Sequence, residues 1–347
     1  MLTDGTGEPL EITFQHYDGD RPSSLLPTEV FTAFERDDLL DYRPSGATAV
    51  PYVHYEYSFP NASIGFRVSG AYRLTVADGA GAELFSVPFY VSEEAAEVEL
   101  AFGATILGGS IGTAIQPAAR VRPGPQLRGT EAFQFTVCFA RDGRLDDLRC
   151  APEPSLLDLT LFQFFLPREE AFTAPPPLYG LDLGLLAVNL DVVDVDRAAQ
   201  PPTATLDLDY AEFGGDLREA ALTGTPLVET AYRDAGQADT DAEYVDVAFN
   251  FVPPGERPVG GPVYVRGSFD RFRRSERLDY VAENGRYEGV ISVKQGAYVY
   301  TYEAPRSPLV RDGVTIGQPS LYTALVFFDD PTQFADRLVA VRTGIAR

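Results

Sequence analysis

Apolar and polar residues alternate with a period of two through many short segments of this chain. In residues 1–94 the alternation predicts strands at 10–14, 29–34 and 54–59. A hairpin follows about the turn Asp78-Gly79, and its inward-facing residues are Tyr72, Leu74, Val76, Phe85, Val87, Phe89 and Val91. Such alternation indicates strands with one buried and one solvated face. With Pro88 on the outward set of an edge strand, the pattern predicts an immunoglobulin-like sandwich for residues 1–94.

The region 95–238 is also rich in strand-like segments. Candidate strands lie at 118–121, 133–139, 159–165, 185–195 and 203–210. Proline runs at 175–177 and 201–202 block helices there, because proline lacks the N–H that a helix needs. Residues 214–238 show no readable pattern, and 234–240 form a polar linker. We therefore expect a middle β-rich domain over 95–238.

The region 239–347 has the clearest strands. The segment 244–252 alternates, and Asn284-Gly285 is a strong hairpin turn between two alternating runs. The next strand places Tyr298, Tyr300 and Tyr302 on one face, for which we predict core packing. Further strands are expected at 287–293, 321–328 and 337–342. The predicted fold class is all-β, with two to three consecutive sandwiches and an early-set-like domain at 239–347.

The composition fits this fold class. The 31 glycines and 27 prolines are spread along 347 residues, which suits short strands joined by turns. No apolar run reaches the roughly 18 residues that a spanning helix needs, and the nearest, 181–195, is interrupted by acidic and glycine residues. We expect a folded protein with no direct membrane insertion.

The charge is strongly acidic, with 51 acidic and 28 basic residues and a net charge of −23. Lys294 is the only lysine. Such a surface repels nucleic acid and anionic lipid, so we expect neither as a partner. Adaptation to a salty habitat explains the acidity, because salt screens self-repulsion; binding of a basic partner is the alternative.

Two cysteines, Cys138 and Cys150, flank the turn Asp142-Gly143. A simple hairpin about that turn would pair Cys138 with a residue near Asp147. A disulfide therefore requires a wider loop or a bulge, and an extracytoplasmic location would favour it. The chain has no CxxC motif and no histidine near either cysteine, which argues against a thiol nucleophile or a metal site.

The sequence offers little catalytic chemistry. His16 and His54 are the only histidines, and neither lies in a motif such as HExxH. Three pairs of adjacent acids could imitate the two carboxylates of a glycosidase, but with 51 acidic residues such pairs are expected by chance. They are Asp37-Asp38, Asp146-Asp147 and Asp329-Asp330. We predict a protein that is not an enzyme, with no catalytic residue and no small-molecule substrate.

Two further segments resemble ligand loops without meeting their requirements. The glycine-rich run 103–112 has no following Lys-Ser or Lys-Thr and no helix, so we interpret it as a loop or irregular strand. The acidic run 239–243 lacks the glycine and the glutamate of a calcium loop. No cofactor and no metal are expected.

Several segments, in the same order along the chain, resemble the plug-protein family of the Bacteroidota-type type IX secretion system, formerly a domain of unknown function. They include LEITFQHYD at 10–18, YEYSFPN at 55–61, SGAYRLTV at 69–76 and DTDAEYVDVAF at 239–249. VYVRG from Val263, VKQGAYVYTY from Val293, LYTALVFF from Leu321 and DRLVAVRT from Asp336 continue the series. Residues 150–235 resemble the family poorly.

The resemblance implies a periplasmic protein, associated with the outer membrane, that docks on a large translocon barrel and occludes its periplasmic mouth when it is idle. Family members carry an export signal and a further strand before the segment matching Leu10. The polar N-terminus shows neither. We therefore expect a truncated or mis-started chain whose first sandwich lacks its first strand. No partner-binding residue is assigned.

An alternative function comes from the last domain. Arg266-Gly-Ser-Phe-Asp-Arg-Phe272 followed by the tyrosine strand is similar to glycogen-binding modules of early-set sandwiches. Those modules stack sugars on a tryptophan at the position of Phe272, and this chain has no tryptophan. The alternative is a carbohydrate-binding protein, although we interpret the likeness as a shared fold. A structural adaptor at the cell surface is a third possibility.

Overall fold

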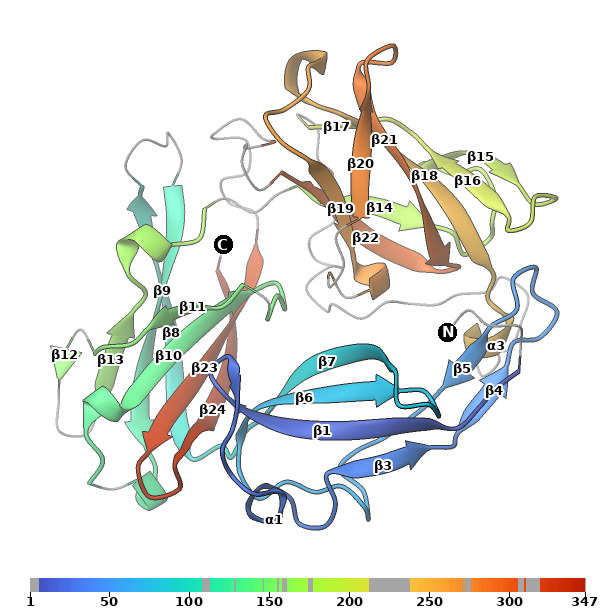
Figure 1. The fold of residues 1–347 in the computed structure, drawn as a ribbon. Helices are drawn as coiled ribbons and strands as arrows, with labels where there is room; N and C mark the ends of the chain where they lie inside the picture. The colour runs from blue at the N-terminus through green and yellow to red at the C-terminus, as the bar shows by residue number, and fades with distance from the viewer. Residues whose placement is uncertain are drawn as a thin grey trace.

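The computed structural model (Figure 1) is built almost entirely of strands, which confirms the predicted all-β class. It describes residues 6–346 except 108–112, 128, 146, 155, 158–160, 174–176, 212–237, 271, 273–275, 305–308 and 310–318. The strands within the described residues form four sheets and a small hairpin. None of the helices in this part of the chain is long and apolar enough to span a bilayer.

The first sheet has the order β2-β1-β6-β7, and β3 also pairs with β1. Its apolar residues, among them Ile12, Phe14 and Tyr72, pack under a cover that includes Phe59 and Phe66. Strand β7 lies at the edge, as Pro88 predicted. The elements are β1 (Leu10–Asp18), β2 (Arg21–Pro22), α1 (Pro27–Val30), β3 (Arg36–Leu39), β4 (Tyr42–Pro44), β5 (Val53–Tyr55), β6 (Gly70–Ala77) and β7 (Glu83–Val91).

The strand predicted at 29–34 was wrong, because this segment begins as the short helix α1. Pro27 occupies the first turn, where its missing N–H costs nothing, and the Glu29 side chain accepts the Leu26 N–H at 2.7 Å. Val30, at the end of α1, and Phe31, in an isolated antiparallel bridge to Phe66, then enter the core. The strand predicted at 54–59 is confined to β5.

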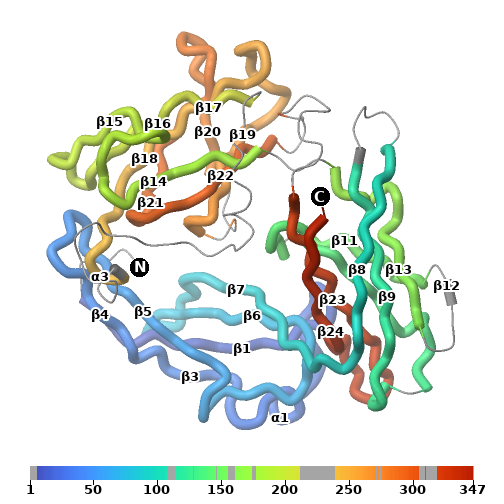
Figure 2. Tube along the Cα trace, turned by 180° about the vertical axis from the view of Figure 1, so that it is seen from behind, coloured from blue at the N-terminus to red at the C-terminus, as the bar shows by residue number. Residues whose placement is uncertain are grey.

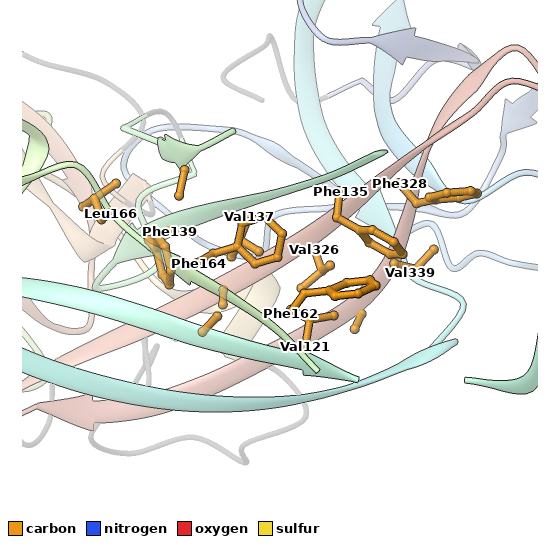
Figure 3. Close-up of a cluster of buried hydrophobic side chains, with 14 of the residues drawn as sticks. Val121, Phe135, Val137, Phe139, Phe162, Phe164, Leu166, Val326, Phe328 and Val339 are labelled. Atoms are coloured by element: carbon orange, nitrogen blue, oxygen red, sulfur yellow. The ribbon is translucent and has the colours of Figure 1, made fainter. Parts of the chain in front are cut away.

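Two four-stranded sheets face each other in the next sandwich, with the orders β11-β10-β23-β24 and β12-β13-β9-β8. Figure 3 shows their shared core, in which Phe135, Phe164 and Val339 are fully buried. The strands are β8 (Ala96–Ile106), β9 (Thr113–Pro123), β10 (Phe135–Arg141), β11 (Arg149–Ala151), β12 (Leu156–Leu157), β13 (Phe162–Phe165), β23 (Ser320–Asp330) and β24 (Ala335–Ala346). Short 3₁₀ turns lie at Pro125–Leu127, Ala132–Gln134 and Arg168–Glu170.

Cys138 and Cys150 form a disulfide across the β10–β11 pair, where they lie directly opposite each other. The connection between these strands is therefore wider than the simple hairpin that would have brought Cys138 near Asp147. Phe133, which we placed in the same strand, precedes it in a 3₁₀ turn and is exposed.

The remaining strands form one sheet that folds over itself, in the order β14-β22-β19-β20-β21-β18-β16-β15, with β17 beside β18. Phe249, Val265 and Tyr300 lie in its core. The elements are β14 (Tyr179–Asp182), β15 (Val192–Asp196), β16 (Thr203–Leu206), β17 (Asp209–Tyr210), α3 (Ala238–Asp241), β18 (Tyr244–Val252), β19 (Val263–Gly267), β20 (Glu276–Val281), β21 (Arg286–Lys294) and β22 (Ala297–Glu303), with 3₁₀ turns at Pro254–Glu256 and Ser268–Asp270.

The sheets do not follow the limits 95–238 and 239–347 expected from the sequence. Strands β14 to β17 join the sheet of β18 to β22, and the last strands β23 and β24 return to β10. In both views the C-terminal strands run beside the green strands of the middle sandwich (Figures 1 and 2). We propose domain limits that follow the sheets: a first domain to residue 94, a middle domain of 95–173 and 319–346, and a third domain of 177–304.

Several predictions concern residues outside the described ones. The unreadable segment 214–238 lies outside them up to residue 237, as does 108–112 of the glycine-rich run and Asp146 of one acid pair. The described part of that run, 103–107, mostly completes β8, which the sequence did not predict as a strand. The acidic run 239–243 begins in α3.

Candidate functional site

A cleft of about 750 Å³ opens between the first and third domains. Its apolar wall includes Leu39, Tyr52, Val53, Phe85, Tyr244 and Ile291. The ionisable side chains in the wall, apart from the tyrosines, are His54, Glu276 and Lys294. These are the groups that could give the cleft a chemistry of its own.

Lys294 and His54 both approach the same residue, Asp239. The Lys294 ammonium donates a hydrogen bond to the Asp239 carbonyl oxygen at 2.6 Å and lies 4.7 Å from the centre of the Tyr52 ring. Nε2 of His54 lies 3.9 Å from the Asp239 carboxylate. Burial lowers the pKa of both side chains, and the charge of Asp239 offsets part of each shift. The His54 contact therefore joins Asp239 to the first domain, whereas the Lys294 hydrogen bond to Asp239 lies within the third domain and Lys294 reaches the first domain at Tyr52.

His16 lies apart from this cleft, in β1. Its Nε2 lies 3.3 Å from the Ser69 carbonyl oxygen, and its ring packs edge-on against Tyr72. Burial lowers the pKa of His16, although Asp18 opposes the shift. The two histidines thus lie apart, and each contacts different neighbours: His16 contacts Ser69 and Tyr72, and His54 contacts Asp239. No group of three or more potential metal ligands gathers among the described residues.

The adjacent acids act in turns and ion pairs. Asp37 accepts a hydrogen bond from the Tyr57 hydroxyl at 2.7 Å, and Asp147 pairs with Arg149. Asp330 caps the turn at Thr332 and pairs with Arg337. None of these contacts has the geometry of two carboxylates flanking a cleft.

A partly buried carboxyl that the sequence did not single out lies in the third domain. Asp209 accepts hydrogen bonds from the hydroxyls of Tyr300 and Tyr302, each at 2.6 Å. Burial raises the pKa of Asp209 to about 7, although the two hydroxyls oppose the shift. The only available signal was the tyrosine stripe, which gives no hint of its partner because β17 is far from β22 along the chain.

The tyrosine stripe itself is core, as predicted. Tyr298, Tyr300 and Tyr302 are all buried, and Tyr302 stacks on Phe251 with ring centres 4.3 Å apart. A sugar platform requires exposed aromatic faces, which this stripe lacks. Phe272 is half-buried and has a left-handed φ of 57°.

The first and third domains are joined through the β4–β5 hairpin and α3. The Tyr52 hydroxyl lies 3.1 Å from the carbonyl oxygen of Asp239 and 2.9 Å from that of Ala242, and can donate to either. The Ala49 N–H donates to the Glu243 carboxylate at 2.8 Å. Each of these contacts involves a main-chain group on at least one side, so the contacts fix how the first domain is positioned against the third as well as holding the two together.

The first and middle domains meet around Arg337. Its guanidinium binds the carboxylates of Glu93 and Asp330 together. The Glu93 N–H donates to the Leu338 carbonyl oxygen at 3.1 Å, and the Asp336 N–H donates to the Asp18 carboxylate at 3.2 Å. Burial would raise the pKa of Glu93, but the hydrogen bonds from Arg337 and Ser69 hold it below its ordinary value.

The middle and third domains are linked by Arg144 and Glu303. The same Glu303 carboxylate lies 3.4 Å from the guanidinium of Arg266, which is itself buried. Each domain therefore contacts both others, and the three follow one another round a closed triangle (Figure 2). The class of protein defined by these features is a multidomain β-sandwich in which ion pairs such as Arg337–Glu93 and Arg144–Glu303 join one domain to another.

Comparison with known proteins agrees with this class. Residues 3–93 match the family model described as "Type 9 secretion system plug protein 1st domain". The chain is also similar to the crystal structure of a hypothetical protein from Parabacteroides merdae ATCC 43184, with a TM-score of 0.83 at 20% identity over 99% of this chain and 88% of that chain. At this identity the likeness shows the fold alone. A search of the curated proteins finds no match.

The match of residues 3–93 supports the resemblance to the plug-protein family of the type IX secretion system that was noted in the sequence. The match supports a role associated with that secretion system, whose plug family supplies a structural component that acts in the periplasm at the outer membrane.

Proposed function

We propose that this chain is a non-enzymatic plug subunit of the type IX secretion system, which occludes the periplasmic mouth of the large outer-membrane translocon barrel. The observation that carries the proposal is the family match of residues 3–93. A barrel wide enough for folded cargo leaks small molecules unless it is stoppered. A plug closes such a barrel through the shape and surface of the folded protein, without catalysing a reaction.

The closed arrangement of the three domains supports this function. A stopper must keep its outline when it is pressed against a pore, and domains linked by a single interface move relative to each other by default. Here the contacts at Tyr52, Arg337 and Arg144 connect every pair of domains. Separating any two domains therefore also strains the other two contacts.

The test is an affinity pull-down of the tagged chain from detergent-solubilised envelopes. We expect a large outer-membrane barrel to co-purify, and we expect cells without the protein to admit small antibiotics that the intact envelope excludes. Retention on an α-glucan column would favour the carbohydrate-binding alternative. Turnover of any substrate by the purified chain would contradict a non-enzymatic role.

A further inference from the structure

One loop of the third domain exposes apolar side chains in close succession. Residues 183–191 connect β14, at one edge of the sheet, with β15, at the other. Leu185, Val188 and Leu190 in this loop are 61%, 64% and 96% exposed, and Val193 at the start of β15 is 48% exposed. Single exposed apolar residues are common on protein surfaces, whereas a cluster of this kind marks an interaction site.

The first half of the loop is fixed to the core beneath it. Leu183 is 1% exposed, and Leu186 packs against the same buried cluster. The Leu183 N–H donates to the Gly296 carbonyl oxygen at 2.9 Å, and the Gln295 side chain donates to the Gly184 carbonyl oxygen at 2.7 Å. The loop thus buries one set of leucines and presents another to solvent.

The second half is fixed by two polar side chains. The Asn189 amide donates to the Asp182 carbonyl oxygen at 2.8 Å, and its oxygen accepts the N–H groups of Asp191 and Val192. The Arg197 guanidinium donates to the Leu185 and Leu186 carbonyl oxygens at 2.9 and 2.7 Å. Leu186 is held at a φ of +43°, which is uncommon for a residue other than glycine. The outward leucines are therefore presented in a defined geometry.

The charges around the loop indicate what kind of surface covers it. Asp182, Asp191, Asp194 and Asp196 flank the apolar residues, and Arg197 is the single basic residue near them in the sequence. These carboxylates would repel anionic lipid headgroups. A protein pocket that is apolar at its centre and basic at its rim would complement both features.

We infer that the 183–193 segment is the anchor by which this chain docks on its partner protein, with Leu185 and Leu190 inserting into an apolar pocket ringed by basic side chains. The inference rests on the proposed function, in which that partner is the translocon barrel. Preformed geometry favours such a contact, because little conformational entropy remains to be lost on binding.

The test compares barrel recovery in the same pull-down for the wild type, Leu190→Asp and Leu185→Asp. Leu40→Asp, at a leucine of the first domain that is as exposed as Leu185, is the matched control. We expect roughly tenfold or greater loss of recovery for the two loop variants, because each replaces a buried apolar contact by a desolvated charge, and no change for Leu40→Asp. Far-UV circular dichroism and Tm of each variant verify that it folds.

The outcomes are distinct. Undiminished recovery with both loop variants would overturn the anchor while leaving the plug function in place. If the wild type recovers no barrel, the proposed function fails and the anchor fails with it. Sedimentation of the wild type with vesicles of phosphatidylethanolamine and phosphatidylglycerol, abolished by Leu190→Asp, would also overturn the inference, because the loop would then bind lipid.

Discussion

Gly70 illustrates how one residue can limit the contact between two domains. It begins β6 with a φ of +134°, and a Cβ built there would lie 2.8 Å from the Asp336 carbonyl oxygen of the middle domain. It would lie equally close to Nε2 of His16. Only glycine therefore allows β6 to pass so near β24.

We predict that Gly70→Ala destabilises the protein by about 1–3 kcal/mol from backbone strain alone, with a further cost where the first and middle domains separate. Urea unfolding measures the change. Gly79→Ala is the control, because its Cβ would meet no heavy atom within 4 Å, and we expect a change within about 0.5 kcal/mol there. Equal effects of the two substitutions would contradict this account of the junction.

The second prediction concerns Asp209 and the pH dependence of the free energy of unfolding. Burial raises its folded pKa to about 7, above the unfolded value of 3.8, so the folded protein binds more protons between these values. The contribution of Asp209 to the free energy of unfolding is therefore greatest at low pH and decreases as the pH rises from about 4 to 7. Asp209→Asn keeps an oxygen to accept from Tyr300 and Tyr302 but cannot ionise.

We expect Asp209→Asn to unfold at a higher urea midpoint than the wild type at pH 7.5, and the gap to narrow by pH 5. Asp279→Asn, at an aspartate whose side chain is 82% exposed, should show no such dependence. A gap that is the same at both pH values would show that Asp209 does not titrate in this window.

At the scale of elements, the disulfide is the strongest local constraint on β11. This strand has three residues and, among the described strands, pairs with β10 alone, so Cys138 and Cys150 fasten a short edge strand. We predict that replacing both cysteines by serine lowers the free energy of unfolding by about 3 kcal/mol, from the entropy of the short closed loop. Guanidinium unfolding with and without reductant measures it. Reductant should have no effect on the double variant.

The success of strand prediction depended on alternation and on burial of one face. Strand β18 begins and ends where the sequence predicted, because Val245, Val247, Phe249 and Phe251 alternate with more exposed residues. Alternation also exists at 29–34, but there Pro27 and Glu29 favour a helical turn. Strand β8 was missed although Val98, Leu100 and Phe102 alternate with more exposed residues, as in a strand with one buried face.

The pairing of strands that are distant along the chain could not be predicted from the sequence. Nothing in 320–346 alone tells whether these strands join β22, which precedes them, or β10, which is far earlier in the chain. The choice depends on whether Val326 and Phe328 complement Phe135 and Phe162 in the middle core. For the same reason the partner of the tyrosine stripe, Asp209, could not be predicted, whereas burial of the stripe could.

At the scale of the whole molecule, Arg337 is the residue whose loss should matter most for the joined domains. It pairs with two carboxylates at once. The pKa of Glu93 lies below its ordinary value because hydrogen bonds from Arg337 and Ser69 outweigh burial, and that of Asp330 because hydrogen bonds from Thr332 and Arg337 do so. A carboxylate whose pKa is lower in the folded than in the unfolded state stabilises the folded protein at pH above about 4. This contribution to the free energy of unfolding is lost as the pH falls through the folded pKa.

We predict that Arg337→Met lowers the free energy of unfolding by about 2–3 kcal/mol at pH 7, with a difference from the wild type that shrinks towards pH 3. The measurement is a series of urea transitions across this range. Arg36→Met removes an exposed pair with Glu11 and should cost less than about 1 kcal/mol. A loss no greater than that of Arg36→Met would show that the junction does not depend on this charge cluster.

The return of β23 and β24 to the middle sandwich has a consequence for how the molecule matures. Two of the four strands in the sheet of β10, β23 and β24, leave the ribosome or an export channel only after the whole of residues 177–304. Until β23 has emerged, the edge of β10 with which it pairs has no neighbouring strand, whereas the strands within residues 177–304 already form a sheet of their own. The middle sandwich should therefore be completed after the third domain, and a nascent polypeptide without β23 and β24 would present the unpaired edge of β10 to chaperones and proteases.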